Sequence, residues 1–400
     1  MRIVHVTDGY LPRVGGIERQ VHDLAVRQQG QGHAVGVVTS ASHAAGNATC
    51  ADVPVIGPAP RRFARRHSAI RYAWSHRGAA RVVEQRPELV HIHLSTFSPL
   101  GFLTARKTVR AGIPTVVTVH SMWDNATPLF RAADLALGWR RWPLTWSAVS
   151  TVAAGPLQQL IGPDRPVTVL PNGVEQRAWQ GRSHEGRPQY VSIVSVMRLA
   201  RRKRPAALLA MLAELRHSVP QSIRLEARII GGGPRRRRLQ REVHRLGLAD
   251  WVQLSGPATH DQIRRIYRGA DVFVSPAKLE SFGIAALEAR CAGLPVVAQA
   301  ESGVRDFIRT GANGLLADGD PDMVRALVTL VEDPALRRRM AIYNQSTASP
   351  HDWSHVLQQC DQLYQLAASR VGARACPAPG ADRGTLPYRA PAALQEAAAS

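Results

Sequence analysis

Short apolar runs alternate with longer amphipathic stretches along most of the chain. In the first part, "RIVHVT" (2–7), "LVHIHL" (89–94) and "TVVTVH" (115–120) are typical of buried strands. Residues 15–33 and several other stretches between such runs have the periodicity of a helix packed on one face. The alternation predicts βα units and a mostly parallel sheet, which excludes all-helical and all-β folds.

The alternation stops at a polar, glycine-containing segment (172–190) and then restarts with "YVSIVSV" (190–196). We therefore predict an α/β fold of two Rossmann-like, doubly wound domains that face a central cleft. The predicted parts are an N-terminal domain (1–175), a C-terminal domain (176–349), a closing helix (350–368) packing back on the first domain, and a disordered tail (370–400).

Composition narrows the cellular setting. Four cysteines without CxxC spacing suit a reducing compartment, and we find neither a signal-peptide pattern nor a run of about 18 apolar residues. These features favour a cytoplasmic protein. The net charge of +21 indicates either an anionic partner or the arginine-rich codon usage of a GC-rich genome, since only Lys107, Lys203 and Lys278 are lysines.

The stretch "ESFGIAALE" (280–288) predicts an anion site beside two carboxylates. A helix beginning near Phe282 and Gly283 would leave Glu280 in the preceding loop and Glu288 inside the helix. The backbone N–H groups of Phe282, Gly283 and Ile284 would then face a phosphate, and the carboxylates would accept hydroxyl hydrogen bonds from a sugar. The alternative is an ordinary strand–loop–helix with solvated glutamates.

Other residues that follow predicted strands point to the same chemistry. Arg198 and Lys203 in "RLARRKRP" suit a diphosphate, although a basic surface loop would look alike. In "IIGGGP", Gly232 and Gly233 permit either close backbone approach to a ligand or a tight turn. Gly15 and Gly16 precede the first helix, in a segment without the lysine of a P-loop.

In combination, these motifs resemble the retaining, nucleotide-sugar-dependent glycosyltransferases of family four, which have the GT-B fold. The matching motifs, in order, are "GGIE", "VTVHSMW" with His120, "VLPNGVE" (169–175), "RLARRK" and "ESFGIAALE". Their order and spacing are specific although each is loose alone, and the resemblance runs from about residue 1 to 345, or to 368 with the closing helix.

The resemblance implies a role for each matching residue. Arg198 and Lys203 would hold the leaving diphosphate, Glu280 would lie by the donor sugar, and Glu288 would bind the ribose. His120 would lie near the donor sugar on the acceptor side, where the alternative is a histidine packed at a strand end. The expected donor-binding backbone is that of Gly15, Gly16, Gly232, Gly233, Phe282, Gly283 and Ile284.

The resemblance also implies that no metal or other cofactor is needed, and "DGD" (318–320) lies too late in the chain for a metal-binding DxD motif. The expected reaction moves a hexose, with retention, from GDP-mannose or a UDP-sugar to a hydroxyl of a lipid, glycan or small molecule. A mannosyltransferase of glycan biosynthesis is one such enzyme. A nucleotide-sugar 2-epimerase of the same fold is the alternative enzyme.

Two basic segments with interleaved aromatic residues, 61–77 and 137–146, lie in the predicted acceptor domain. We expect them to dock on an anionic inner membrane leaflet, which would make the protein peripheral. The alternative is a solvated basic face over core tryptophans. A non-catalytic nucleic-acid binder would use the same charge, but the strand-end motifs do not fit it, so no nucleic acid is expected.

Overall fold

The computed structural model describes residues 1–12, 15–41, 53–57, 68–123, 127–181 and 189–372. The chain forms two compact units. Unit 1 contains Met1–Ala148, Pro156–Leu170 and the chain from Leu357 onward, and unit 2 contains Val149–Gly155 and Pro171–Val356. Each unit is described by itself.

Unit 1 is built on a parallel seven-stranded sheet in the order β3-β2-β1-β4-β5-β6-β7. Its strands are β1 (Arg2–Thr7), β2 (Ala34–Thr39), β3 (Val55–Ile56), β4 (Leu89–Leu94), β5 (Thr115–Val119), β6 (Thr145–Ala148) and β7 (Thr168–Val169). The chain winds outward from β1 in one direction and from β4 in the other, so a topological switch point lies between these two strands.

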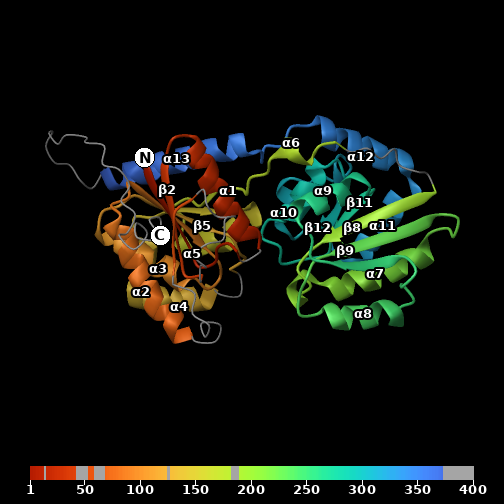
Figure 1. The fold of residues 1–400 in the computed structure, drawn as a ribbon, viewed down its shortest axis with the longest axis horizontal. Coiled ribbons are helices and arrows are strands. Elements are labelled where there is room, and N and C mark those ends of the chain that lie inside the picture. The colour runs from red at the N-terminus through yellow and green to blue at the C-terminus, as the bar shows by residue number, and fades with distance from the viewer. Residues whose placement is uncertain (13–14, 42–52, 58–67, 124–126, 182–188, 373–400) are drawn as a thin grey trace, which may run out of the picture. The chain divides into compact units, whose positions relative to one another are not determined.

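Helices cover both faces of this sheet (Figure 1). One face is covered by helix α1 (Gly16–Gly30) and by the part of helix α13 (Trp353–Gly372) that belongs to unit 1, from Leu357 on. Side chains of both helices form hydrogen bonds with strand side chains there. Helices α2 (Ser68–Glu84), α3 (Pro99–Arg110) and α4 (Thr127–Leu137) lie on the other face. Helix α5 (Thr151–Ile161) follows β6.

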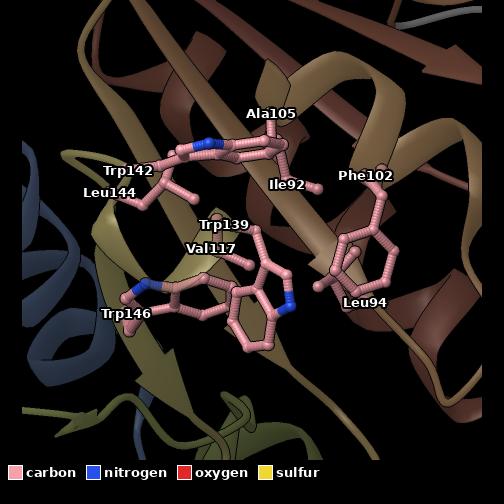
Figure 2. Close-up of a pocket in the computed structure, with 10 residues that line it drawn as sticks. Ile92, Leu94, Phe102, Ala105, Val117, Trp139, Trp142, Leu144 and Trp146 are labelled. Carbon is pink, nitrogen blue, oxygen red and sulfur yellow. The ribbon is translucent and has the colours of Figure 1, made fainter. Parts of the chain in front are cut away.

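The two faces of this sheet differ in chemistry because side chains alternate along a strand. In β4, His91 and His93 point to the face of α1 and α13, whereas Ile92 and Leu94 point to the face of α3. Figure 2 shows the latter face, where these aliphatic side chains meet Trp139, Trp142 and Trp146 and surround a small gap lined by apolar side chains. That gap offers no group for a phosphate.

The tryptophans of 137–146 therefore correct one expectation. Trp139 and Trp146 are 2% and 1% exposed, and Trp142 is partly buried, so the alternative of core tryptophans is right for this segment. Of the other basic segment, 61–67 lies outside the described residues and 68–77 belongs to α2. None of the helices in the described parts of the chain is long and apolar enough to span a membrane.

Unit 2 contains a parallel six-stranded sheet in the order β10-β9-β8-β11-β12-β13. Its strands are β8 (Tyr190–Val196), β9 (Arg224–Ile230), β10 (Val252–Gly256), β11 (Val272–Ser275), β12 (Val296–Gln299) and β13 (Gly314–Ala317). Its helices include α6 (Gln176–Trp179), α7 (Pro205–Ser218), α8 (Arg236–Arg245), α9 (His260–Arg268), α10 (Ile284–Cys291), α11 (Asp320–Glu332) and α12 (Pro334–Ser346).

The core of unit 2 lies where α7 and α11 pack on the sheet. Leu208 and Leu212 of α7 and Leu327 of α11 are fully buried against Ile193 and Val274 of the central strands. Burial of each such side chain contributes about 1.5–3 kcal/mol. The expectation of two doubly wound α/β domains is confirmed, and the closing helix extends to Gly372. Residues 373–400 of the predicted tail lie outside the described residues.

Candidate functional site

Most of the expected donor-site residues of unit 2 follow strands at its topological switch point. The chain winds outward from β8 through β9 and from β11 through β12, so the loops after β8 and β11 begin at neighbouring strand ends. Arg198 lies in the loop after β8, and Glu280 lies in the loop after β11. Ligands of open α/β sheets bind at such a point.

Lys203 and Glu280 form an ion pair between these loops. The Lys203 Nζ donates a hydrogen bond to Glu280 Oε2, and the two side chains are 33% and 15% exposed. Arg202 Nε also donates to the Leu279 carbonyl, at 3.3 Å. The Arg198 side chain is exposed, and Arg198 precedes Lys203 in the same loop after β8. Both expected phosphate-binding cations therefore belong to this loop.

The N-terminus of α10 lies directly after Glu280, as expected. Gly283 caps the helix in the left-handed region, with φ 93°, and a Cβ there would lie 2.6 Å from Val304 Cγ2. The Phe282 side chain is buried against Phe307 and His351, so only its backbone can meet a ligand. Ile284 begins the helix, whose first-turn N–H groups favour an anion.

Glu288 is buried inside α10 rather than solvated. Its Oε1 lies 3.5 Å from His260 Nε2, and the His260 ring packs edge-on against Trp179. The Glu288 carboxylate also contributes to raising the pKa of the Tyr267 phenol, after the main effect of burial. His260 was not expected from the sequence, although Thr259 before it forms a capping box that marks the start of α9.

The three glycines after β9 lie where the backbone of this loop passes close to the backbone of the loop after β8. Leu199 N donates to Gly232 O at 2.9 Å, which joins this loop to the one after β8. A Cβ at Gly231 would overlap the Met197 carbonyl oxygen, and one at Gly233 would lie 2.5 Å from the Leu199 carbonyl oxygen. Gly233 is therefore explained by packing, whereas a Cβ at Gly232 would meet only the Pro257 ring, at an ordinary contact distance of 3.9 Å.

A second ion pair fixes the end of the Lys203 loop. Arg204, with φ 55°, donates two hydrogen bonds to Asp320, at 2.8 and 2.6 Å, and a third to the Pro276 carbonyl at 3.0 Å. The hydrogen bonds from Arg204 lower the pKa of the Asp320 carboxyl. The last aspartate of "DGD" therefore has a structural partner. No sequence motif indicated this pair, because its members are 116 residues apart.

Gly15 and Gly16 lie at the start of α1 in unit 1. Gly15 is the extended N-cap residue, and Gly16 opens the helix. The Glu18 carboxylate lies where a Cβ of Gly15 would be, and it also lies 2.9 Å from the Cβ position of Gly9. Glu18 is 8% exposed. The sequence contains this glutamate in "GGIE", but its contact with both glycines was not expected.

His120 follows β5 in unit 1 and is 8% exposed. Its backbone N–H donates to the Leu94 carbonyl at 2.8 Å, and its Nε2 lies 3.0 Å from Nδ1 of His93. Burial lowers the pKa of the His120 imidazole to about 4, so the ring is neutral at pH 7. The structure thus groups His120 with buried histidines of unit 1, and groups Lys203, Glu280 and the α10 terminus in unit 2.

Two family models match the chain. The model described as "Glycosyltransferase Family 4" matches residues 14–177, and the model described as "Glycosyl transferases group 1" matches residues 180–347. Together they cover most of the described parts of both units.

Curated relatives include D-inositol 3-phosphate glycosyltransferases of actinobacteria. The protein of Thermomonospora curvata is 31% identical over 326 residues, covering 72% of this chain and 73% of the relative. The protein of Corynebacterium jeikeium is 34% identical over 215 residues, covering 52% of this chain and 51% of the relative. The chain thus matches about half the length of the latter protein.

Solved structures of similar fold include Anabaena HepE in complex with UDP and glucose, with a TM-score of 0.73 at 18% identity, covering 92% of this chain and all of that one. Sucrose-phosphate synthase from Thermosynechococcus elongatus has a TM-score of 0.72 at 19% identity, covering 92% of this chain and 99% of that one. These likenesses confirm the expected GT-B type of fold.

Proposed function

Because this chain belongs to glycosyltransferase family 4, we propose that it transfers a hexose from a nucleoside-diphosphate sugar to a hydroxyl acceptor, with retention of configuration. The observation that carries the proposal is the Lys203–Glu280 ion pair beside the N-terminus of α10. The comparisons do not favour the 2-epimerase or the basic nucleic-acid binder.

The proposed mechanism is electrostatic. Departure of a nucleoside diphosphate places negative charge on its oxygens, and preorganised cations and helix N-termini stabilise such charge in the transition state. Arg198, Lys203 and the first turn of α10 would supply this stabilisation without a metal ion. When a diphosphate binds, the Lys203 ammonium would exchange the Glu280 carboxylate for a phosphate oxygen.

That exchange would leave Glu280 able to accept hydrogen bonds from hydroxyls of the donor sugar. Glu288, in the second turn of α10, would accept hydrogen bonds from the ribose. Gly232 and the backbone of Phe282 and Gly283 would allow the phosphates to approach. In unit 1, the first turn of α1 at Gly15 and Gly16 would contact the donor phosphate, and His120 would lie near the sugar.

We propose a UDP-sugar as the donor, with GDP-mannose as the alternative. The UDP-sugar is supported by the structures of similar fold, which were solved with UDP, with UDP and glucose, and with UDP-glucose. For the acceptor, the names of the relatives support a small phosphorylated polyol, and the net charge of +21 suits an anionic molecule. Lipid and glycan acceptors, and docking on an anionic membrane through 61–77, remain hypotheses.

Isothermal titration calorimetry with UDP, GDP and ADP tests this function. We expect one nucleotide to bind tightly, and Lys203→Ala to weaken it at least tenfold, as loss of a charge-assisted hydrogen bond predicts. Lys107→Ala is the matched control, because this lysine lies in α3 of unit 1. Absence of binding by all three nucleotides would overturn the proposal.

Assays with UDP-glucose, UDP-N-acetylglucosamine and GDP-mannose, each with and without inositol phosphate, would then identify the reaction. Release of nucleotide that depends on the acceptor supports transfer. Conversion of the sugar without an acceptor would support the epimerase instead.

A further inference from the structure

Four histidines of unit 1 belong to one buried chain of hydrogen bonds under α1 and α13. His5 of β1, His91 and His93 of β4, and His120 after β5 are all less than 9% exposed. Their rings lie in sequence across the sheet, with His5 to His93 and His93 to His120 centroids both 5.2 Å apart. The expected position of His120 near the donor sugar, on the acceptor side, does not explain the other three histidines.

The direction of these hydrogen bonds follows from a backbone carbonyl at one end. The Val117 carbonyl can only accept, so Ser147 Oγ donates to it at 3.3 Å. Ser147 Oγ must then accept from Thr118 Oγ1 at 2.7 Å, because its single proton is used. Thr118 Oγ1 in turn accepts from His91 Nε2 at 2.7 Å.

The same reasoning continues through α13 and α1. His91 is neutral because burial lowers its pKa well below the usual value. Since its one ring proton is on Nε2, its Nδ1 accepts a hydrogen bond from the Tyr364 hydroxyl at 2.9 Å. The Cys360 thiol also contacts this hydroxyl, but sulfur is the weaker acceptor. The Tyr364 oxygen therefore accepts from Gln28 Nε2 at 2.9 Å, which turns Gln28 Oε1 toward His5.

From Gln28 the order passes through three imidazoles to His120. His5 Nε2 donates to Gln28 Oε1 at 2.8 Å, which leaves His5 Nδ1 as an acceptor for His93 Nε2 at 3.0 Å. His93 Nδ1 is then an acceptor for His120 Nε2, also at 3.0 Å. Burial lowers the pKa of His5 and His120 to about 4 and that of His93 well below its usual value, so each ring has one proton.

We propose that Tyr364 and Gln28 are positioning residues that hold His120 as the neutral tautomer protonated on Nε2, with Nδ1 as its hydrogen-bond acceptor. The proton order stands on these contacts alone. Its consequence for catalysis rests on the proposed function, in which an acceptor nitrogen at His120 takes a hydrogen bond from a substrate hydroxyl. A ring of the opposite tautomer would present a donor there instead.

The Tyr364 hydroxyl suits this role because it cannot ionise near neutral pH. Burial raises its pKa well above the usual value, and the Asp361 carboxylate on the same helix adds to that effect. The described side chains in hydrogen bonds with His5, His91 and His93 are neutral at pH 7: imidazoles, Gln28, Thr118 and the Tyr364 phenol. No charged side chain among these partners therefore determines which ring nitrogens have the protons.

A metal ion is the competing explanation, since ring nitrogens of His5, His91 and His93 lie within 4.8 Å of one another. A metal needs an imidazole lone pair, and each neutral ring has only one. Here the lone pair of His91 accepts from Tyr364, that of His5 accepts from His93, and that of His93 accepts from His120. A metal would break all three hydrogen bonds.

The test is nitrogen-15 NMR of histidine-labelled protein, because protonated and unprotonated ring nitrogens have widely separated shifts. The His120→Gln variant assigns the His120 resonances by their loss. We expect wild-type His120 at pH 7 to show a protonated Nε2 and an unprotonated Nδ1. A protonated Nδ1, an imidazolium, or one tightly bound transition metal per chain by elemental analysis would overturn the proposal.

Variants then test which residues set the order. Tyr364→Phe lets the Gln28 amide turn over, after which the imidazoles of His5, His93 and His120 can reverse and His120 becomes a mixture of tautomers. Gln28→Leu removes the same constraint by a different change. We expect both to alter the His120 shifts and to lower kcat about tenfold or more with little change in the donor KM.

The control is Thr108→Val, which removes another fully buried hydroxyl of unit 1 whose partner is the Ala105 carbonyl. It should leave both the His120 shifts and kcat unchanged. Unaltered His120 shifts in folded Tyr364→Phe and Gln28→Leu proteins would refute the positioning role. Ordered shifts in a protein without transferase activity would remove the proposed function and leave the proton order intact.

Discussion

The Lys203 ammonium and the Glu280 carboxylate neutralise each other at the start of α10. Each belongs to a loop at the end of a different strand, β8 or β11, and these strands are neighbours in the sheet. A bound diphosphate would compete with the carboxylate for the same ammonium. The pair therefore couples donor binding to the side chain expected beside the sugar.

The first prediction follows from this competition. Glu280→Ala should bind the free nucleoside diphosphate as tightly as wild type or more tightly, because the ammonium loses its competing carboxylate. Lys203→Ala should instead lower kcat/KM about 10²- to 10³-fold, as loss of one electrostatic donor does at other active sites. Calorimetry and steady-state kinetics measure the two effects, and equal loss of nucleotide affinity in both variants would contradict the competition.

A second prediction concerns the cap of α10. Gly247 is the control position, because it also has a positive φ, of 66°, but has open space around it. Gly247→Ala should therefore cost about 1–2 kcal/mol of unfolding free energy through backbone strain alone. Gly283→Ala adds an overlap with Val304 and should cost about 1–3 kcal/mol more, as overpacking does. Urea unfolding of the two variants measures the difference, and equal losses would mean that Val304 moves aside freely.

A third prediction concerns the Arg204–Asp320 pair. Asp320→Ala should lower nucleotide affinity about three- to tenfold, because the loop that holds Lys203 loses its bidentate anchor. Asp322→Ala is the matched control, since Asp322 lies in the same first turn of α11 and its partners are local, namely the Arg325 side chain and the Asp318 backbone N–H. Both variants lose one carboxylate at the helix N-terminus, so only the difference in nucleotide affinity reports on the loop. Equal affinities would contradict this role.

Periodicity predicted the strands well where they are apolar and central. The runs 2–7, 89–94 and 190–196 match β1, β4 and β8 to the residue. Strand β3 was not predicted because it has two residues, too few to show a period. Helix α12 was not predicted either, although Pro334 at its start is a recognisable helix signal.

Pairings between distant parts of the chain were beyond the sequence. Lys203 and Glu280 were each expected at a phosphate, but 77 residues separate them, and no local pattern indicates that they touch. The alternation in "LVHIHL" does place His91 and His93 on one face of β4, a signal that was available. Their partner Tyr364 is 273 residues from His91, and only the packing of α13 brings it there.

The last prediction concerns the stability of unit 1 in acid. His5 and His120 have folded-state pKa values lowered from 6.5 to about 4 by burial, and burial also lowers the pKa values of His91 and His93 well below their usual value. Between pH 6.5 and 4 the unfolded chain therefore binds protons that the folded chain does not, so the free energy of unfolding falls as the pH falls through this window. A single lowering from 6.5 to 4 is worth about 3 kcal/mol.

Urea unfolding at pH 7.5, 6, 5 and 4 measures this loss, which should reach at least about 3 kcal/mol by pH 4. The buried His351 of unit 2, whose pKa is also lowered to about 4, contributes in the same window. Exchange of β4 and β5 amides, corrected for its intrinsic pH dependence, isolates unit 1 from that contribution. Stability that is constant or rises on acidification from pH 6.5 to 4 would show that the four rings are not buried as neutral imidazoles.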